Sequence, residues 1–68
     1  MRNMTVGANI KYYREKANLS QQKLANAIDK SKQTVSLYER DKFALNSDNI
    51  IAICDELNIT PNQLLGYE

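Results

Sequence analysis

The chain has 68 residues, of which 43% are hydrophobic and 25% are charged, and its formal net charge is +1. This composition is typical of one small globular domain and excludes an intrinsically disordered chain. One cysteine and no histidine exclude an internal disulfide and a Cys/His zinc site, and no apolar run is long enough to span a membrane. We therefore expect a cytoplasmic protein with no metal, cofactor or membrane contact.

The charges are segregated along the sequence. All nine basic residues precede residue 43, together with four acidic ones, which gives a charge of +5, whereas the remainder carries −4. The near-neutral total thus combines a basic region with an acidic one, a pattern typical of a protein that turns one end toward a polyanion. Chance segregation on a solvated surface is the alternative interpretation.

Apolar residues at helical spacing predict a first helix over residues 6–17. The residues on its buried face are Val6, Ile10, Tyr13 and Ala17. Gly7 permits close packing of this helix, and Asn18 ends it because asparagine tolerates the left-handed conformation that follows many helices.

Two short helices are predicted next, over residues 21–28 and 32–40. Each follows a serine that serves as its N-cap, Ser20 and Ser31. The residues expected to face inward are Leu24, Ala25, Ile28, Val35 and Tyr38. The three residues between the helices are too few for antiparallel packing but suit a steep crossing, which is the geometry of a helix-turn-helix.

A fourth helix is predicted over residues 47–57, and a fifth begins at Pro61, where Thr60 and Gln63 form a capping box. The apolar residues of these helices that we expect in the core are Ile50, Ile53, Cys54, Leu57, Leu64 and Leu65. Cys54 is expected to be a small core residue and not a reactive thiol. No alternation of period two persists, so the predicted fold class is all-α.

The segment NLSQQKLANAIDKSKQTVSLYERDK resembles the helix-turn-helix core of the lambda-repressor/Cro-like (XRE-type) transcription regulators. The similarity extends from about Val6 through Leu65. The matching positions are Leu19, Ser20 and Gln21 at the start of the second helix, Leu24 and Ala25 within it, and Val35, Tyr38 and Glu39 in the third. The resemblance implies a compact five-helix domain over residues 6–66 behind a flexible arm of residues 1–5.

The resemblance also implies a pair between Arg14, late in the first helix, and Glu39, at the end of the third. Beneath the DNA-facing surface such a pair would join the two helices, since loss of one partner leaves a shielded charge uncompensated. Two independent surface charges are the alternative.

The chain departs from the family at four helix ends, where the family commonly has glycine. This chain has Asn18, Asp29, Asp41 and Asn58 there. Asparagine and aspartate are the non-glycine residues that best tolerate the left-handed region, so we expect the same backbone path at a cost of about 1 kcal/mol per position. Asp29 and Asp41 also add negative charge near the expected DNA face, which counts against high affinity.

Outward residues near the start of the third helix are candidates for base contacts: Lys32, Gln33, Ser36 and Leu37. Lys32 can donate to guanine, and Gln33 can bond adenine through two hydrogen bonds. Leu37 meets either a thymine methyl or the connection to the fourth helix. The candidates for phosphate contacts are Gln21, Thr34, Arg40 and Lys42.

No enzyme is expected, because the chain has no histidine, no phosphate-binding glycine loop and no nucleophile with a paired base. The predicted function is sequence-specific binding of double-stranded DNA by a transcription regulator, a repressor, that acts as a homodimer on a palindromic operator. The residues expected at the dimer contact are Leu64, Leu65 and Tyr67. No small-molecule ligand is implied. The alternative, which the low net charge and the acidic Asp29 and Asp41 favour, is a protein-interaction or antitoxin-type helix-turn-helix module with weak or no specific DNA binding.

Overall fold

The computed structural model of the protein describes residues 4–67. Its helices are α1 (Val6–Lys16), α2 (Gln21–Ala27), α3 (Lys32–Glu39), α4 (Ser47–Leu57) and α5 (Pro61–Leu65). No strand occurs among the described residues, and the prediction of an all-α, five-helix domain is confirmed. Of the expected N-terminal arm, residues 1–3 lie outside the described part, and Thr5 is the N-cap of α1.

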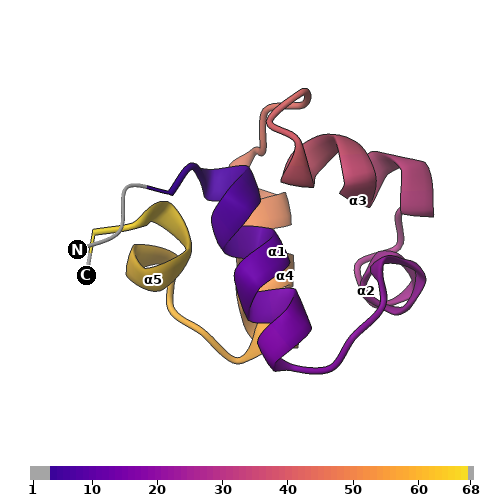
Figure 1. Ribbon diagram of the computed structural model, residues 1–68, viewed down its shortest axis with the longest axis horizontal. Helices are drawn as coiled ribbons and strands as arrows, with labels where there is room; N and C mark the ends of the chain where they lie inside the picture. Colours follow the sequence, from indigo (N-terminus) through magenta and orange to yellow (C-terminus); the bar gives the residue numbers. More distant parts are fainter. Residues whose placement is uncertain (1–3, 68) are drawn as a thin grey trace.

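The helices α1 and α4 lie at the centre, with α5 on one side and the α2–α3 pair on the other (Figure 1). In this view α3 lies in the plane while α2 is seen end-on, so the two helices cross steeply. The contact between α2 and α3 is the most extensive between any two helices, and α1 packs against both α3 and α5. The steep crossing predicted from the short connection is therefore present.

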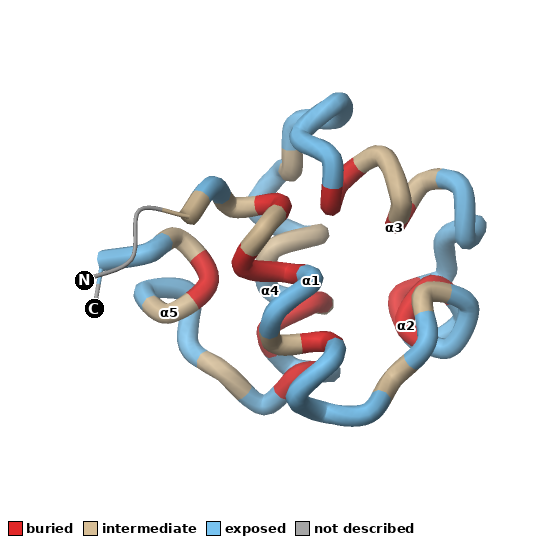
Figure 2. The backbone as a smooth tube through the Cα atoms, in the orientation of Figure 1, coloured by how far each residue is buried: buried red, intermediate tan, exposed pale blue. Residues whose placement is uncertain are grey.

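The core lies where the inner faces of the helices meet, as the buried segments in Figure 2 show. Its members are Ile10, Leu24, Ala25, Ile28, Val35, Tyr38, Ile53, Cys54, Leu57 and Leu64. Val6, Tyr13 and Ile50 are partly buried and pack against it. The prediction was wrong for Ala17, which is exposed, because α1 ends at Lys16 and the chain turns away at this C-cap.

Every helix of the described residues begins in the same way. A side-chain oxygen of the N-cap residue accepts a hydrogen bond from the backbone N–H three residues later, at 2.8 to 3.1 Å. The five N-caps are Thr5, Ser20, Ser31, Asn46 and Thr60. Because the first N–H groups of a helix have no partner within it, each cap fixes the residue at which its helix starts.

The helix ends are equally uniform. Each is followed by a residue with positive φ, and two backbone hydrogen bonds close the last turn in the pattern of a Schellman motif. These residues are Asn18, Asp29, Asp41, Asn58 and Gly66. The expectation that asparagine and aspartate replace glycine without changing the backbone path is confirmed, since their φ angles lie between 57° and 60°.

Candidate nucleic-acid interface

One side of α3 is fixed by its burial. Val35 is fully buried and Tyr38 nearly so. The Tyr38 hydroxyl accepts a hydrogen bond from Asn49 Nδ2 at 3.0 Å, which ties α3 to the first turn of α4. Because Val35 and Tyr38 are buried in the core, the opposite side of α3 is turned outward.

The four candidates for base contacts divide by exposure. Lys32 and Gln33, in the first turn of α3, are exposed, whereas Ser36 and Leu37 are half-buried. The first-turn side chains are therefore the more accessible of the four, as a recognition helix that inserts its N-terminal end requires. Leu37 is only partly shielded, so both of its interpretations stay open.

The candidates for phosphate contacts lie at the two ends of the helix pair. Arg40 and Lys42 are exposed directly after α3, and Arg40 Nε donates to the Ser36 carbonyl at 3.3 Å. Thr34 is half-buried, and its hydroxyl lies 3.0 Å from the Ser31 hydroxyl. Lys42 is thus the candidate whose side chain makes no hydrogen bond or ion pair with the described residues.

Gln21, the fourth phosphate candidate, is turned partly inward. Its Nε2 donates to Glu39 Oε1 at 2.9 Å and joins the start of α2 to the end of α3. Only the second N–H of this amide is left for a phosphate. The sequence pattern gave no signal for this inward contact.

Arg14 and Glu39 form a buried ion pair under this surface. Arg14 Nε lies 2.6 Å from Glu39 Oε2, and Nη2 lies 3.2 Å from Oε1. Arg14 Nη1 also donates to the Leu19 carbonyl at 2.8 Å, so the guanidinium is bonded on three sides. The pair and its neighbours join α1, the α1–α2 connection, α2 and α3 at one point.

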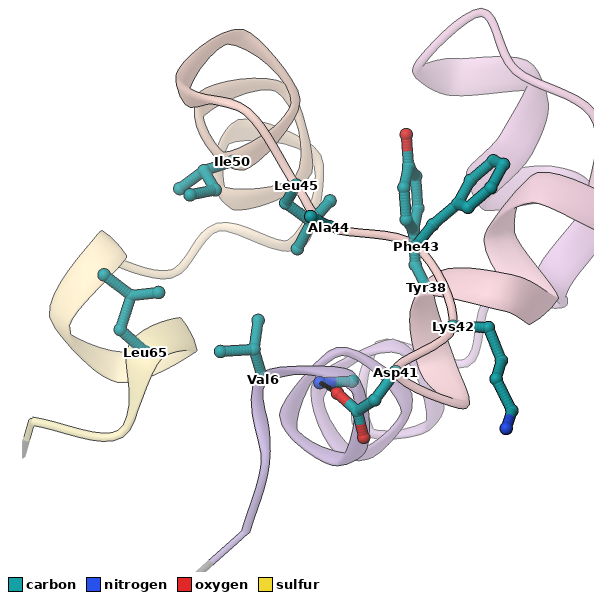
Figure 3. A pocket seen from close by; sticks show the side chains of 10 residues that line it. Val6, Tyr38, Asp41, Lys42, Phe43, Ala44, Leu45, Ile50 and Leu65 are labelled. Carbon is teal, nitrogen blue, oxygen red and sulfur yellow. Dashed lines mark hydrogen bonds between the residues drawn. The ribbon is translucent and has the colours of Figure 1, made fainter.

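Asp41 lies at the other end of α1. Its Oδ1 accepts from the Gly7 backbone N–H at 2.9 Å, and its Oδ2 accepts from the Thr5 hydroxyl at 2.6 Å. Figure 3 shows this carboxylate beside the first turn of α1, while the Lys42 side chain points away from the neighbouring pocket. A carboxylate at a helix N-terminus is favourable, because the free N–H groups there carry partial positive charge.

Gly7 makes this approach possible. A Cβ at Gly7 would lie 2.7 Å from both the Glu39 carbonyl oxygen and Asp41 Oδ1, and it would collide with the Tyr38 carbonyl oxygen. The end of α3 therefore packs directly on the backbone of α1. The close packing expected at this glycine is confirmed.

A pocket of about 340 Å³ opens beside Asp41, between α1, α4, α5 and the α3–α4 connection (Figure 3). Val6, Leu45, Ile50 and Leu65 make much of its lining apolar. Leu65 is half-buried at this pocket and Tyr67 is exposed, whereas Leu64 is fully buried in the core. The expectation that Leu64 contributes to a dimer contact is therefore wrong, because its side chain is used in the protein's own core.

Sequence reasoning missed Asn9. This residue is buried, and its Nδ2 donates to the Leu64 carbonyl at 2.9 Å, which ties α1 to α5. The only sign of its burial in the sequence is its position directly before the core residue Ile10.

A family model described as helix-turn-helix matches residues 10–64, which is most of the chain. The chain belongs to this helix-turn-helix family. The resemblance to XRE-type regulators is thereby confirmed. No curated protein matches the chain at a significant level. None of the helices in residues 4–67 is long and apolar enough to cross a membrane.

Several solved structures share the helix-turn-helix fold. The P22 c2 repressor in complex with synthetic operator 9T is 26% identical, with a TM-score of 0.89 over 97% of this chain and 100% of that chain. The restriction-modification controller protein C.AhdI from Aeromonas hydrophila is 27% identical, with a TM-score of 0.82 over 87% of this chain and 89% of that chain. The clp gene regulator ClgR from Corynebacterium glutamicum, at 23% identity and a TM-score of 0.85, shares the fold over 88% of this chain and 64% of its own.

Proposed function

We propose that the protein is a sequence-specific transcription regulator, a repressor, that binds double-stranded DNA as a homodimer with α3 in the major groove. The observation that carries this proposal is the arrangement of α3. Its inner residues are anchored in the core, and Lys32 and Gln33 stand exposed in its first turn. The similar P22 c2 repressor, whose structure was determined with a synthetic operator, supports the same use of the fold.

Base contacts are assigned to the outward residues of α3. Lys32 donates to guanine O6 or N7, and Gln33 bonds adenine N6 and N7 through its amide. Ser36 and Leu37 lie one turn further along, where Leu37 suits a thymine methyl. Bidentate and donor contacts of this kind carry the sequence preference.

Phosphate contacts are assigned to the residues that flank this helix. Lys42 and Arg40 follow α3, Thr34 lies within it, and Gln21 lies at the start of α2 beside its exposed N-terminal turn. Such contacts supply affinity and fix orientation without sequence information. Gln21 has a double role, because the same amide that faces the DNA also donates to Glu39.

Dimerisation follows from the small footprint of one recognition helix. Two copies related by a two-fold axis would place their α3 helices in successive major grooves of a palindromic operator, roughly 34 Å apart. Tyr67, which is 78% exposed, and the half-buried Leu65 supply the apolar contact between copies. A cytoplasmic location belongs to the same proposal.

The rival function, a protein-interaction or antitoxin-type module, loses part of its support. It rested on the low net charge and on the acidic Asp29 and Asp41 near the DNA face. The Asp41 carboxylate is bonded to α1, so its presence has a structural reason that is independent of any partner protein.

Fluorescence anisotropy with a random-sequence duplex tests the proposal. We expect binding at low salt. The logarithm of the binding constant should fall steeply and linearly with the logarithm of the salt concentration, because each phosphate contact releases counterions. Selection of bound sites from a random DNA pool should then return a symmetric sequence with half-sites about one turn apart. Absence of binding at low salt would contradict the proposal, and binding without any selected sequence would leave only non-specific DNA binding.

A further inference from the structure

The carboxylate of Asp41 makes contacts with α1 that the turn after α3 does not require. The left-handed conformation is also adopted by Asp29, at the equivalent position after α2, with a φ of 60° against 58° for Asp41. The Asp29 side chain makes no hydrogen bond or ion pair with the described residues, whereas Asp41 accepts two hydrogen bonds from α1 and its cap. The backbone conformation alone therefore does not account for the carboxylate at position 41.

We propose that Asp41 is a positioning residue for DNA binding, which holds the α3–α4 connection against α1 so that the neighbouring Lys42 meets a backbone phosphate. This inference rests on the proposed function. It assigns Asp41 a role that its negative charge, taken alone, would oppose.

The connection between α3 and α4 has few hydrogen bonds to the rest of the fold. The Lys42 backbone N–H donates to the Leu37 carbonyl at 2.9 Å, but residues 43–45 make no backbone hydrogen bond with the described residues. Leu45 packs against the core and the Phe43 ring lies beside Tyr38, but the next residue fixed by a hydrogen bond is Asn46, the N-cap of α4. Asp41 is thus the side chain that links this stretch to the rest of the fold by hydrogen bonds.

The helix that Asp41 contacts, α1, is itself held at several points. α1 is joined to α5 through Asn9 and to α3 through Arg14 and Glu39. Its first turn also packs backbone to backbone on the end of α3, because Gly7 has no Cβ. The hydrogen bonds from Asp41 to this turn and its cap therefore hold the residue next to Lys42 against a helix that is fixed at several points.

The negative charge of Asp41 is directed toward α1. A carboxylate close to DNA repels phosphates, but the Asp41 oxygens are directed at the N–H of Gly7 and the hydroxyl of Thr5. The positive end of α1 offsets part of this charge. Lys42, the next residue, is exposed and points away from the pocket toward solvent (Figure 3).

Two substitutions at this position separate charge from hydrogen bonding. Asp41→Asn and Asp41→Gly remove the same negative charge, and both residues tolerate a positive φ. Only asparagine keeps an oxygen that can accept from Gly7 N–H. Asp29→Gly is the matched control, because it makes the same change in charge at the same backbone conformation without removing a contact.

The measurement is the salt dependence of binding to a random-sequence duplex, followed by fluorescence anisotropy. The slope of the logarithm of the binding constant against the logarithm of the salt concentration should be the same for the wild type, Asp41→Asn and Asp29→Gly. For Asp41→Gly we expect this slope to be shallower by about 0.9, which corresponds to one lost phosphate contact. In a Lys42→Ala background, Asp41→Gly should change the slope no further, because both changes remove the same contact.

Thermal unfolding by circular dichroism accompanies each variant, so that loss of folding is not taken for loss of a contact. If Asp41→Gly does not fold, Thr5→Val, which removes the donor to Asp41 Oδ2 together with the N-cap of α1, is compared with Thr5→Ser, which keeps both; Thr60→Val, which removes only the N-cap of α5, controls for a lost cap. Equal slopes for the two variants of the pair used, or a further decrease in the Lys42→Ala background, would overturn the inference. Wild-type binding that does not depend on salt would instead overturn the proposed function on which it rests.

Discussion

Arg14 and Glu39 are joined by two parallel hydrogen bonds, Nε to Oε2 at 2.6 Å and Nη2 to Oε1 at 3.2 Å, with both residues 8% exposed. A pair in this setting is costly to break, because the remaining partner is left as a buried charge without compensation. Gln21 and the Leu19 carbonyl complete its hydrogen bonds. The pair therefore acts as a joint between helices and not as a surface ion pair.

Glu39→Ala should lower the free energy of unfolding by about 3–5 kcal/mol, since it leaves the Arg14 guanidinium buried and unpaired. Urea denaturation followed by circular dichroism measures the change. The double variant Arg14→Met with Glu39→Leu should lose less than Glu39→Ala alone. A loss in the double variant equal to the sum of the losses in Arg14→Met alone and Glu39→Leu alone would show that the two side chains act independently.

Gly7→Ala should destabilise the fold by about 1–3 kcal/mol through overpacking. Alanine is the better helix former by up to about 1 kcal/mol, so a stabilised variant would show that the contact with the end of α3 is not tight. Gly66→Ala is the comparison, because its Cβ would come no closer than 3.5 Å to another atom and its cost arises from the φ of 83°. Both changes are measured by urea denaturation.

Gln33→Ala and Lys42→Ala should affect DNA binding in different ways. Gln33→Ala should relax the preference at one base position, with a loss of about 1–3 kcal/mol for the selected sequence, whereas Lys42→Ala should weaken all sequences alike. Anisotropy titrations with a selected and a random duplex distinguish these outcomes. Equal losses on both duplexes for both variants would contradict the division into base and phosphate contacts.

Cys54 should be unreactive in the folded protein and should lower stability at alkaline pH. Burial, with a smaller contribution from Asp55, raises the pKa of the Cys54 thiol. A folded-state pKa above the unfolded one adds stability at pH values below the unfolded pKa, and this stability is lost as pH rises through the folded pKa. Between about pH 7 and pH 10, the wild type should lose more unfolding free energy than Cys54→Ala does.

Urea denaturation at both pH values provides this comparison, and alkylation by iodoacetamide with and without denaturant reports access to the thiol. The loss on raising the pH would be the same in both proteins if the thiol were as free to ionise in the folded state as in the unfolded one. Rapid alkylation of the folded protein would equally contradict its burial.

The helix boundaries could be predicted well from the sequence because they are set by local chemistry. Thr60 and Gln63 form a capping box in both the prediction and the structure, and Ser47 begins α4 as expected. Ala17 was predicted as the last residue of the first helix but is its C-cap, because apolar periodicity does not show at which residue a Schellman motif ends a helix. The steep crossing of α2 and α3 followed from the length of their connection.

The candidate site was less predictable where contacts join distant parts of the chain. The resemblance named Arg14 and Glu39, but no pattern indicated that Gln21 completes their hydrogen bonds. Asp41 was expected to shape a turn. Its hydrogen bonds to Gly7 and Thr5, which precede it by 34 and 36 positions, depend on how α1 packs against α3. Such contacts are set by tertiary geometry, which sequence spacing does not encode.

The uniform helix ends have a consequence for how quickly the chain folds. Because each helix has a side-chain cap at its start and a left-handed residue at its end, its boundaries are specified by residues within or beside it. Folding then requires the docking of short helices whose ends are already specified, including the packing of α1 on α5 at the far end of the chain. Helical domains with mostly local contacts fold within microseconds to milliseconds, and we expect this protein to do the same in a temperature-jump or stopped-flow experiment.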